Sequence, residues 1–275
     1  MLVAVLGANG QLGTDLVKEA GDRDVVPVTD VDIRDEKAVR DLVGRLNPHL
    51  IVNAAAYVDV EGCETDRERA FAVNAYGVRN LVETGVRLVQ VSTDYVFDGA
   101  ARQPYREDDR PEPINVYGES KLAGEVFAHG HLIVRSSGLY GIAATRAKGN
   151  FVRTMLRLGR ERGEVSVVTD QVLAPTNTED LARALWEMVD AGATGIYHAT
   201  NSGQCSWFEF AQAIFDLSRM DVAVRPTDTA TLNYKARRPA FSVLDNSKLA
   251  RVGITPLRPW RDALAAHLEA LAPLT

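Results

Sequence analysis

The stretch "MLVAVLGANGQLGTDLV", residues 1–17, decides the fold. An apolar run comes first, a turn with Gly7, Gly10 and Gly13 follows, and an amphipathic run then begins. A strand, a tight glycine turn and a helix form a unit that holds the pyrophosphate of a dinucleotide, because glycine lets backbone N–H groups approach the phosphates at the helix N-terminus. A glycine-rich turn that binds nothing has the same pattern. We expect the dinucleotide to contact Gly7, Asn9, Gly10, Gln11, Leu12 and Gly13.

The same alternation continues beyond this turn. Short apolar runs and longer amphipathic runs alternate five times within the first 140 residues or so. Continuous Val/Ile/Leu strands joined by helices indicate a parallel sheet covered on both faces, which is the doubly wound, Rossmann-type α/β fold. After residue 150 the pattern becomes mixed and, from 221 to 259, rich in loops and proline. We predict a dinucleotide-binding domain of residues 1–149 plus 177–200, and a smaller interleaved α/β substrate lobe of residues 150–176 plus 201–275.

The composition is that of an ordinary globular protein. The chain has 275 residues, of which 46% are hydrophobic and 25% charged, and its formal charge is −6. Acidic and basic residues are interspersed, so neither nucleic acid nor an anionic membrane surface is an expected partner. No apolar run reaches the roughly 18 residues of a membrane-spanning helix. We expect a small-molecule partner, and apolar residues on several long helices permit a homodimer.

Cysteine and histidine usage points away from metal and disulfide chemistry. The two cysteines, Cys63 and Cys205, lie in different segments, and the five histidines are scattered. This pattern builds neither a disulfide framework nor a thiolate zinc site. The N-terminal apolar run lacks a basic leader and a cleavage site. We therefore predict a cytoplasmic protein without a bound metal.

Acidic residues follow the second apolar strand. Asp30 lies 17 residues beyond Gly13, where a carboxylate can hydrogen-bond an adenosine ribose and repel a 2′-phosphate, which slightly favours NADH over NADPH. Asp32 and Ile33 would flank the adenine. Two alternatives stay open: either acid could cap the helix that follows, and Arg34 could accept a 2′-phosphate.

Small and polar residues end the third and fourth strands. Ala54, Ala55 and Ala56 would let a flat cofactor lie against the backbone, although a tight strand-to-loop crossing needs the same residues. The fourth strand runs into "STDYVF", with Thr93, Asp94 and Tyr95 at the carboxyl edge of the sheet, where open α/β sheets bind ligands. We expect these three side chains to contact the substrate.

Tyr117 and Lys121, in "VYGESK", stand four positions apart on one predicted helix. Reduction of a ketone needs hydride on carbon and a proton on oxygen, and a phenol with a pKa near 10 donates poorly at neutral pH. An adjacent ammonium would lower that pKa; three pH units correspond to about 4 kcal/mol. We predict that Thr93 holds the substrate oxygen, Tyr117 donates the proton, and Lys121 tunes the phenol and bonds the nicotinamide ribose.

The ordered series "GANGQLG", "VNAAAYVDVE", "STDYVFDG", "NVYGESKLAGE", "DQVLAPT" and "RRPAFSVLDNSKL" resembles the extended short-chain dehydrogenase/reductases, and within them the dTDP-4-dehydrorhamnose reductase family. The resemblance covers nearly all of the chain. It implies a catalytic triad of Thr93, Tyr117 and Lys121, and NAD(P)H as hydride donor. It also implies a substrate that carries a 4-keto-6-deoxyhexose on a nucleoside diphosphate, with dTDP-L-rhamnose as product.

Two positions depart from that family. Gly138 stands in "RSSGLYG" where the family usually has an aromatic residue, and Leu173 stands in "DQVLAPT" where glycine is usual. The change beside the hexose leaves the identity of the sugar open. Some family members use Mg²⁺ at a glutamate-rich dimer contact, and no such glutamates are identified here.

Three later residues are candidates for the substrate. Arg238, in "KARRPAFS", presents a planar guanidinium suited to a pyrophosphate, although a solvated surface role is the alternative. Asn150 and Gln171 are candidates for the sugar or nucleotide, against a helix cap or a structural hydrogen bond.

Two other functions stay open at this point. One is a nucleotide-sugar epimerase or dehydratase that keeps NAD tightly bound, for which Asp94 would be the extra acid or base. The other is a non-catalytic NADP-binding regulatory subunit, because some relatives of these reductases attach to a methionine adenosyltransferase. The complete triad argues against the second.

Overall fold

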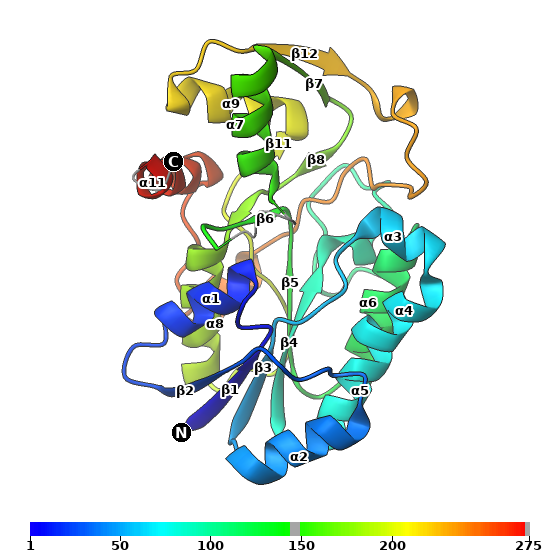
Figure 1. The fold of residues 1–275 in the computed structure, drawn as a ribbon, viewed down its shortest axis with the longest axis vertical. Helices are drawn as coiled ribbons and strands as arrows, with labels where there is room; N and C mark the ends of the chain where they lie inside the picture. The colour runs from blue at the N-terminus through cyan, green and yellow to red at the C-terminus, as the bar shows by residue number, and fades with distance from the viewer. Residues whose placement is uncertain (144–148, 273–275) are drawn as a thin grey trace.

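The computed structural model describes residues 1–143 and 149–272, and it is built around one six-stranded sheet (Figure 1). The strand order is β2-β1-β3-β4-β5-β10, and every neighbouring pair is parallel. The strands are β1 (Leu2–Leu6), β2 (Asp24–Val28), β3 (Leu50–Asn53), β4 (Arg87–Thr93), β5 (Leu132–Ser136) and β10 (Gly195–His198). The predicted doubly wound α/β class is confirmed.

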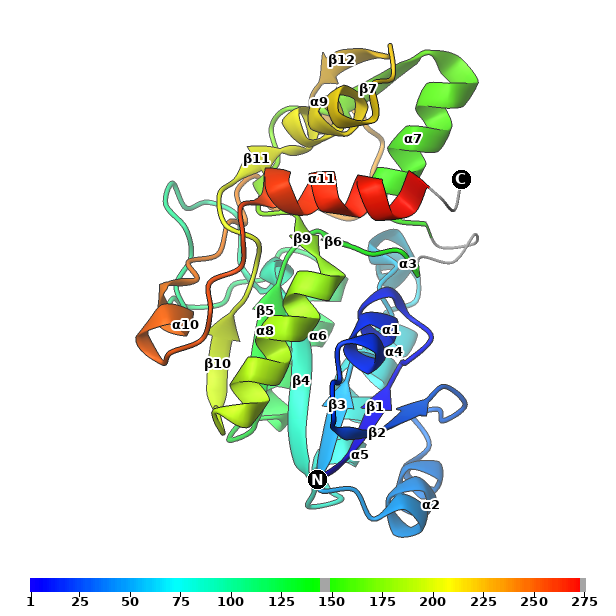
Figure 2. The ribbon, with the colours of Figure 1, turned by 90° about the vertical axis from the view of Figure 1, so that its left-hand side faces the viewer.

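Helices cover both faces of this sheet (Figures 1 and 2). Successive side chains of a strand point to opposite faces of the sheet, so apolar residues at consecutive positions give each face an apolar surface for helices to cover. Val3 and Val5 pack with α1 and α8, whereas Ala4 and Leu6 pack with α2 and α5. The helices of the two layers are α1 (Gln11–Lys18) and α8 (Thr178–Asp190) on one face, and α2 (Glu36–Leu46), α3 (Val60–Thr65), α4 (Arg67–Phe71), the π-helical η1 (Ala72–Tyr76), α5 (Gly77–Val82) and α6 (Val116–Phe127) on the other.

The strand order reverses between β1 and β3. From β1 the chain moves outward to β2, and from β3 it moves the other way to β4 and β5. Connections that leave in opposite directions open a crevice at the carboxyl ends of these two strands, which is where ligands of such sheets bind. The glycine turn after β1 and the alanines after β3 both lie there.

A smaller lobe sits beyond the carboxyl edge of the sheet (Figure 1). Its core is aromatic: the ring of Phe210 lies 5.6 Å from Tyr140, 5.7 Å from Phe151 and 5.8 Å from Trp260. Its main elements are α7 (Phe151–Arg162), β7 (Glu164–Val168), α9 (Trp207–Ser218), β12 (Ala223–Thr227) and α11 (Trp260–Leu271).

Short elements connect the two lobes. Two-residue ladders pair β6 (Leu139–Tyr140) with β9 (Thr176–Asn177), and β8 (Val172–Leu173) with β11 (Cys205–Ser206). The chain returns from the small lobe through α8, which packs on α1, and β10, which extends the sheet beside β5. The remaining elements are η2 (Asp94–Val96), η3 (Thr229–Thr231) and α10 (Ser247–Arg251).

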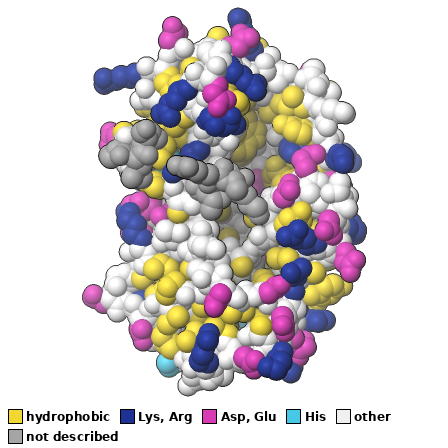
Figure 3. Space-filling view, viewed as in Figure 1, with side chains coloured by type: hydrophobic (Ala, Val, Ile, Leu, Met, Phe, Trp, Pro, Cys, Tyr) yellow, Lys and Arg dark blue, Asp and Glu magenta, His cyan; other side chains and the backbone are white. Residues whose placement is uncertain are grey.

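The surface carries charges of both signs. Figure 3 shows Lys and Arg side chains interspersed with Asp and Glu over the face seen in Figure 1. Both cysteines are free and buried. Within the described part of the chain, no helix has the length and apolar character needed to cross a bilayer.

Candidate active site

A cavity of about 680 Å³ lies between the two lobes, at the carboxyl edge of the sheet. It brings together most of the predicted site residues, from the ends of three strands, two helices and the small lobe. Those that line it are Gly7, Asn9, Gly10, Gln11, Leu12, Ala54, Ala55, Ala56, Thr93, Asp94, Tyr95, Tyr117, Lys121, Asn150 and Gln171. The predicted residues outside its lining are Gly13, Asp30, Asp32, Ile33 and Arg238.

The glycine turn packs directly against the end of β3. Gly7 has φ +73°, and a Cβ there would lie 2.7 Å from the backbone nitrogen of Ala55. A Cβ on Gly13 would lie 2.1 Å from the carbonyl oxygen of Gly7. Gly13 therefore shapes the turn without facing the cavity, and only glycine fits at either position.

The start of α1 suits a bound anion. Gly10 is the N-cap residue, no side chain caps the helix, and its first turn has no acidic residue. The first N–H groups of a helix lack partners within the helix and carry partial positive charge. These residues fit the pyrophosphate of a dinucleotide.

Gln11 ties this turn to the small lobe. Its Oε1 accepts hydrogen bonds from the backbone nitrogen of Gly141 at 2.9 Å and from Nδ2 of Asn150 at 2.8 Å. Asn150 in turn caps α7, because its Oδ1 accepts from the nitrogen of Arg153 at 2.9 Å. The helix-cap alternative for Asn150 is therefore present in the structure, at a position that also lines the cavity.

The acidic residues after β2 are surface residues. Asp32 forms a close ion pair with Arg34, whose Nη2 lies 2.6 Å from Oδ2, and both side chains are 48% exposed. This pairing lowers the pKa of Asp32, and it engages the guanidinium that could accept a 2′-phosphate. Ile33 is buried against Gly77, and Asp30 is exposed. All three residues stand near the end of β2 as predicted, outside the cavity.

The start of α6 positions Tyr117. Asn115 caps the helix by accepting from the nitrogen of Gly118 at 2.8 Å, and a Cβ on Gly118 would lie 2.1 Å from the carbonyl oxygen of Tyr95. This close approach sets the helix against η2, where the rings of Tyr95 and Tyr117 meet edge to face at 5.9 Å. The Tyr117 hydroxyl thereby faces the same cavity as Thr93, whose side chain lowers the pKa of the phenol.

The expected lowering of the phenol's pKa by Lys121 is wrong for this arrangement. Burial raises the pKa of Tyr117, the hydrogen bond with Thr93 lowers it, and the nearby Asp94 raises it further. The Nζ of Lys121 donates instead to the carbonyl oxygen of Val91 at 2.7 Å. Desolvation is the largest of these effects, so the phenol stays protonated, which is the form that donates a proton.

Lys121 and Asp94 are the one basic and the one acidic side chain among the described residues that line the cavity. Burial lowers the pKa of Lys121 to about 8, while Glu125 raises it. Burial also raises the pKa of Asp94, against hydrogen bonds from hydroxyls of Ser242, Ser137 and Thr93 that lower it. The polar wall therefore consists of hydroxyl groups arranged around one carboxyl group.

The remaining predicted substrate residues are held by partners within the chain. Nε2 of Gln171 donates to Oγ1 of Thr229 at 2.8 Å. Arg238 lies over the ring of Tyr234 at 3.7 Å and pairs with Glu61 at 2.9 Å. Although burial raises the pKa of Glu61, hydrogen bonds from Lys235 and Arg238 lower it below its ordinary value. Arg238 thus fastens the segment before Pro239 to α3.

Gly138 and Leu173, the two departures from the family pattern, lie next to each other. A Cβ on Gly138, which has φ +54°, would lie 2.7 Å from Cδ1 of Leu173 and 3.7 Å from the ring of Trp207. The leucine therefore fills space that a side chain at position 138 would otherwise take, and Trp207 joins it in the cavity wall.

Sequence reasoning missed several lining residues. Ser136 ends β5 and Ser137 follows it, so the rule that ligands bind at carboxyl ends of strands could have found them. Trp207 and Ser242 come from distant segments of the small lobe and carry no local signal. Asn74, in η1, also went unnoticed; its Nδ2 donates to Oγ of Ser120 in α6 at 3.0 Å, which braces the helix that carries Tyr117.

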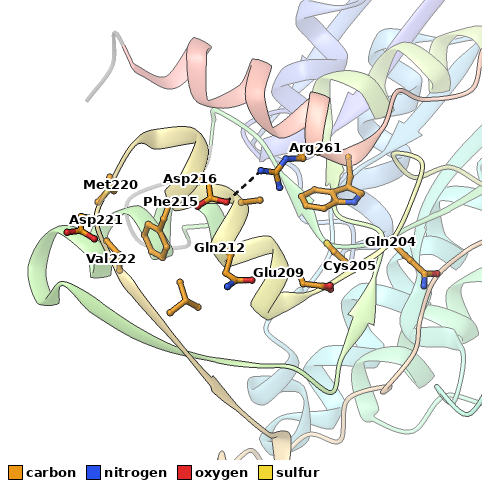
Figure 4. Close-up of a pocket in the computed structure, with 13 residues that line it drawn as sticks. Gln204, Cys205, Glu209, Gln212, Phe215, Asp216, Met220, Asp221, Val222 and Arg261 are labelled. Atoms are coloured by element: carbon orange, nitrogen blue, oxygen red, sulfur yellow. Dashed lines mark ion pairs between the residues drawn. The ribbon is translucent and has the colours of Figure 1, made fainter.

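A second hollow, of about 530 Å³, lies on the small lobe between α9, β12 and the start of α11 (Figure 4). It contains an ion pair of Arg261 with Asp216 at 3.7 Å, and none of the predicted site residues lines it. Among residues 1–143 and 149–272, no group of His, Cys, Asp and Glu side chains is placed to hold a metal ion. The absence of a metal stays a prediction.

Comparison with known proteins places this site in a family. The model of the RmlD substrate binding domain matches residues 1–272. The chain is 40% identical over 280 residues to the spore coat polysaccharide biosynthesis protein SpsK of Bacillus subtilis (strain 168). This alignment covers 97% of this chain and 96% of SpsK. The chain is 39% identical over 292 residues to the dTDP-4-dehydrorhamnose reductase of Mycobacterium tuberculosis (strain ATCC 25618 / H37Rv), which covers 99% and 94% respectively.

A solved structure agrees with these relatives. The dTDP-4-dehydrorhamnose reductase from Bacillus anthracis str. Ames, in complex with NADP, matches with a TM-score of 0.93 and 39% identity, over 98% of this chain and 99% of that one. The resemblance inferred from the motifs is confirmed: the chain belongs to the RmlD substrate binding domain family.

Proposed function

We propose that this chain is an NAD(P)H-dependent oxidoreductase that reduces the C4 keto group of a nucleotide-linked 6-deoxy-4-keto sugar, converting dTDP-4-dehydrorhamnose to dTDP-L-rhamnose. One observation carries the proposal: Thr93, Tyr117 and Lys121 lie on the wall of the same cavity as the uncapped start of α1. The relatives named dTDP-4-dehydrorhamnose reductase, which match nearly the whole chain, support it.

The residues of the cavity have distinct roles in this reaction. The bound dinucleotide supplies the hydride. Thr93, which lines the cavity together with Tyr117, holds the substrate oxygen beside the phenol. Tyr117 is protonated at neutral pH and gives its proton to that oxygen. The Lys121 ammonium stabilises the phenolate that develops, because charges interact strongly where water is excluded.

In this proposal, one lobe binds the cofactor and the other binds the sugar-nucleotide substrate. Residues 1–149 plus 177–200 hold the dinucleotide, and residues 150–176 plus 201–275 hold the sugar nucleotide. Asp94 and Tyr95 contact the hexose from η2, while Asn150 and Gln171 contact it from the small lobe. Arg238 reaches a diphosphate only if its pair with Glu61 opens.

The cofactor preference is part of the test. The Bacillus anthracis relative binds NADP, whereas Asp30 favours NADH, so both reduced cofactors have to be compared. We further propose a cytoplasmic location, which the two free cysteines suit, and a homodimer, which size-exclusion chromatography with light scattering would test.

The decisive assay follows oxidation of NADH and NADPH by the purified protein with dTDP-4-dehydrorhamnose, and identifies the product by NMR. We expect oxidation of reduced cofactor to match formation of dTDP-L-rhamnose in equal amounts. No oxidation with either cofactor would contradict the proposal. Stoichiometric NAD⁺ in the purified protein would favour the epimerase or dehydratase, and cofactor binding without turnover would favour the regulatory subunit.

A further inference from the structure

Glu125 is a buried acidic residue for which the proposed mechanism has no role. It lies on α6 four residues after Lys121 and eight after Tyr117, so the three side chains share one face of the helix. Lys121 is 5% exposed and Glu125 4% exposed. A charged carboxylate one helical turn behind the lysine of the site acts on that lysine directly.

Two strands hold the Glu125 carboxylate in place. Ser92, in β4, donates its hydroxyl to Oε1 at 2.5 Å. Arg135, in β5, donates from Nε to Oε1 at 2.9 Å and from Nη2 to Oε2 at 2.6 Å. Such a two-pronged pair fixes the position of the carboxylate.

The guanidinium of Arg135 is itself enclosed. It is 1% exposed, its Cζ lies 5.1 Å from the ring centre of Phe97, and its Nη1 lies 3.5 Å from Nε2 of His198. Burial lowers the pKa of His198 to about 3, so the imidazole is neutral. A buried ion pair of this kind often adds little to the stability of the fold, because proteins in which apolar residues replace such a pair are often as stable.

The Glu125–Arg135 ion pair lies next to the site that holds Lys121. Lys121 donates to the carbonyl oxygen of Val91, and the next residue, Ser92, donates to Glu125, so one strand end connects the two side chains. The other titratable groups in the cavity wall are Tyr117, Asp94 and Tyr95, and burial raises the pKa of each, which disfavours their charged forms. Glu125 is the acidic side chain one helical turn from Lys121, and Arg135 and Ser92 hold its carboxylate.

We propose that Glu125 is a positioning residue for the reduction: held by Arg135 and Ser92 one helical turn behind Lys121, its carboxylate directs the Lys121 ammonium toward the cavity. The inference rests on the proposed role of Lys121 and adds a residue that never touches substrate or cofactor. Its signature is a change in pH dependence, because a purely structural residue would lower activity equally at every pH.

Glu125→Gln is the first test, since glutamine keeps the shape and removes the charge. We expect the alkaline fall of kcat/KM, and of NADPH affinity measured by fluorescence, to move down by about one pH unit. Starting from a Lys121 pKa of about 8, this means about a fivefold loss at pH 8 and little change at pH 6. Glu119→Gln is the matched control on the same helix, where the carboxylate is 38% exposed and pairs with Arg67. Its pH profiles should equal those of the wild type.

Two further variants separate charge from folding. Glu125→Gln leaves Arg135 buried without its partner, so Glu125→Gln/Arg135→Met removes both charges and restores a neutral interior. We expect the double variant to keep the shifted profile, and a return to the wild-type profile would overturn the proposal. If both variants fail to fold by circular dichroism, Ser92→Ala carries the test, and unchanged profiles in that variant would overturn it.

The two readouts fail separately. NADPH titration needs no turnover, so a shifted binding profile in a protein without reductase activity would contradict the proposed function and support the role of Glu125. Normal wild-type reduction with unshifted profiles in Glu125→Gln would contradict only the role of Glu125.

Discussion

At the scale of single residues, the hydroxyl of Tyr117 is the group on which the chemistry depends. The ring packs edge to face against Tyr95 and the residue lines the cavity beside Thr93, so it has both a packing role and a chemical one. Burial keeps the phenol protonated, and the nearby ammonium becomes useful when the proton leaves. The neutral phenol and the buried cation together suit proton donation rather than proton abstraction.

Tyr117→Phe separates the two roles. We expect kcat to fall by roughly 10²- to 10⁴-fold, the usual contribution of a positioned proton donor. The ring and its packing remain, so the NADPH dissociation constant and the thermal midpoint should change little. Steady-state kinetics and a fluorescence titration measure both quantities, and a variant that retains most of its kcat would exclude Tyr117 as the acid.

At the scale of elements, the side-chain carboxamide of Gln11 connects α1 to the start of α7. Gln11 begins the helix that fits the pyrophosphate, and Asn150 begins the first helix of the small lobe. A second contact lies beside it, where Asp15 of α1 accepts a hydrogen bond from Thr178 at the start of α8. The cofactor turn is therefore braced by the elements that enter and leave the small lobe.

Gln11→Ala should loosen this junction. It removes the acceptor of two N–H groups, and leaving such buried groups unpaired costs about 1–3 kcal/mol. We expect a rise in the dissociation constant of NADPH and in the KM for the sugar nucleotide, because the change reaches both lobes. Isothermal titration and initial rates test this, with the exposed Gln212→Ala as control. An effect on only one ligand would show that the junction does not couple the lobes.

At the scale of the whole molecule, two buried histidines make the fold sensitive to acid. Burial lowers the pKa of His198 to about 3 and that of His267 to about 4. Their exposed fractions are 0% and 3%. The unfolded chain takes up these protons near pH 6.5, well before the folded protein does. Stability from both groups is therefore complete above pH 6.5 and is lost as the pH falls toward 4.

His267→Gln measures this contribution. Between pH 6.5 and 5, protonation of this histidine in the unfolded chain alone lowers the free energy of unfolding by roughly 2 kcal/mol, at about 1.4 kcal/mol per pH unit. Urea unfolding at pH 7 and pH 5 should therefore show a smaller drop in unfolding free energy for the variant than for the wild type. The exposed His129→Gln should behave as the wild type does. Equal pH dependence in all three proteins would contradict the assignment.

The outcome at each scale follows the range of the interactions involved. The glycine turn, the strand ends and the Tyr117/Lys121 spacing were predictable because they depend on neighbours within a few residues. The partners of Lys121 and Glu125 were not, since Lys121 bonds Val91 of β4 and Glu125 pairs with Arg135 of β5. The same reason explains Arg238, whose partner Glu61 lies far away in the chain.

The sequence alone determined the parallel sheet, the cofactor turn at residues 7–13 and the three residues proposed for catalysis, because backbone conformation and periodicity are local properties. Only the tertiary structure decided how far the site is buried from solvent. This burial raises the pKa of Tyr117, whereas the sequence predicted a lower value. The tertiary structure also decided that Leu173 and Trp207 stand beside Gly138 in the cavity wall. Desolvation and packing depend on segments that meet only when the chain is folded.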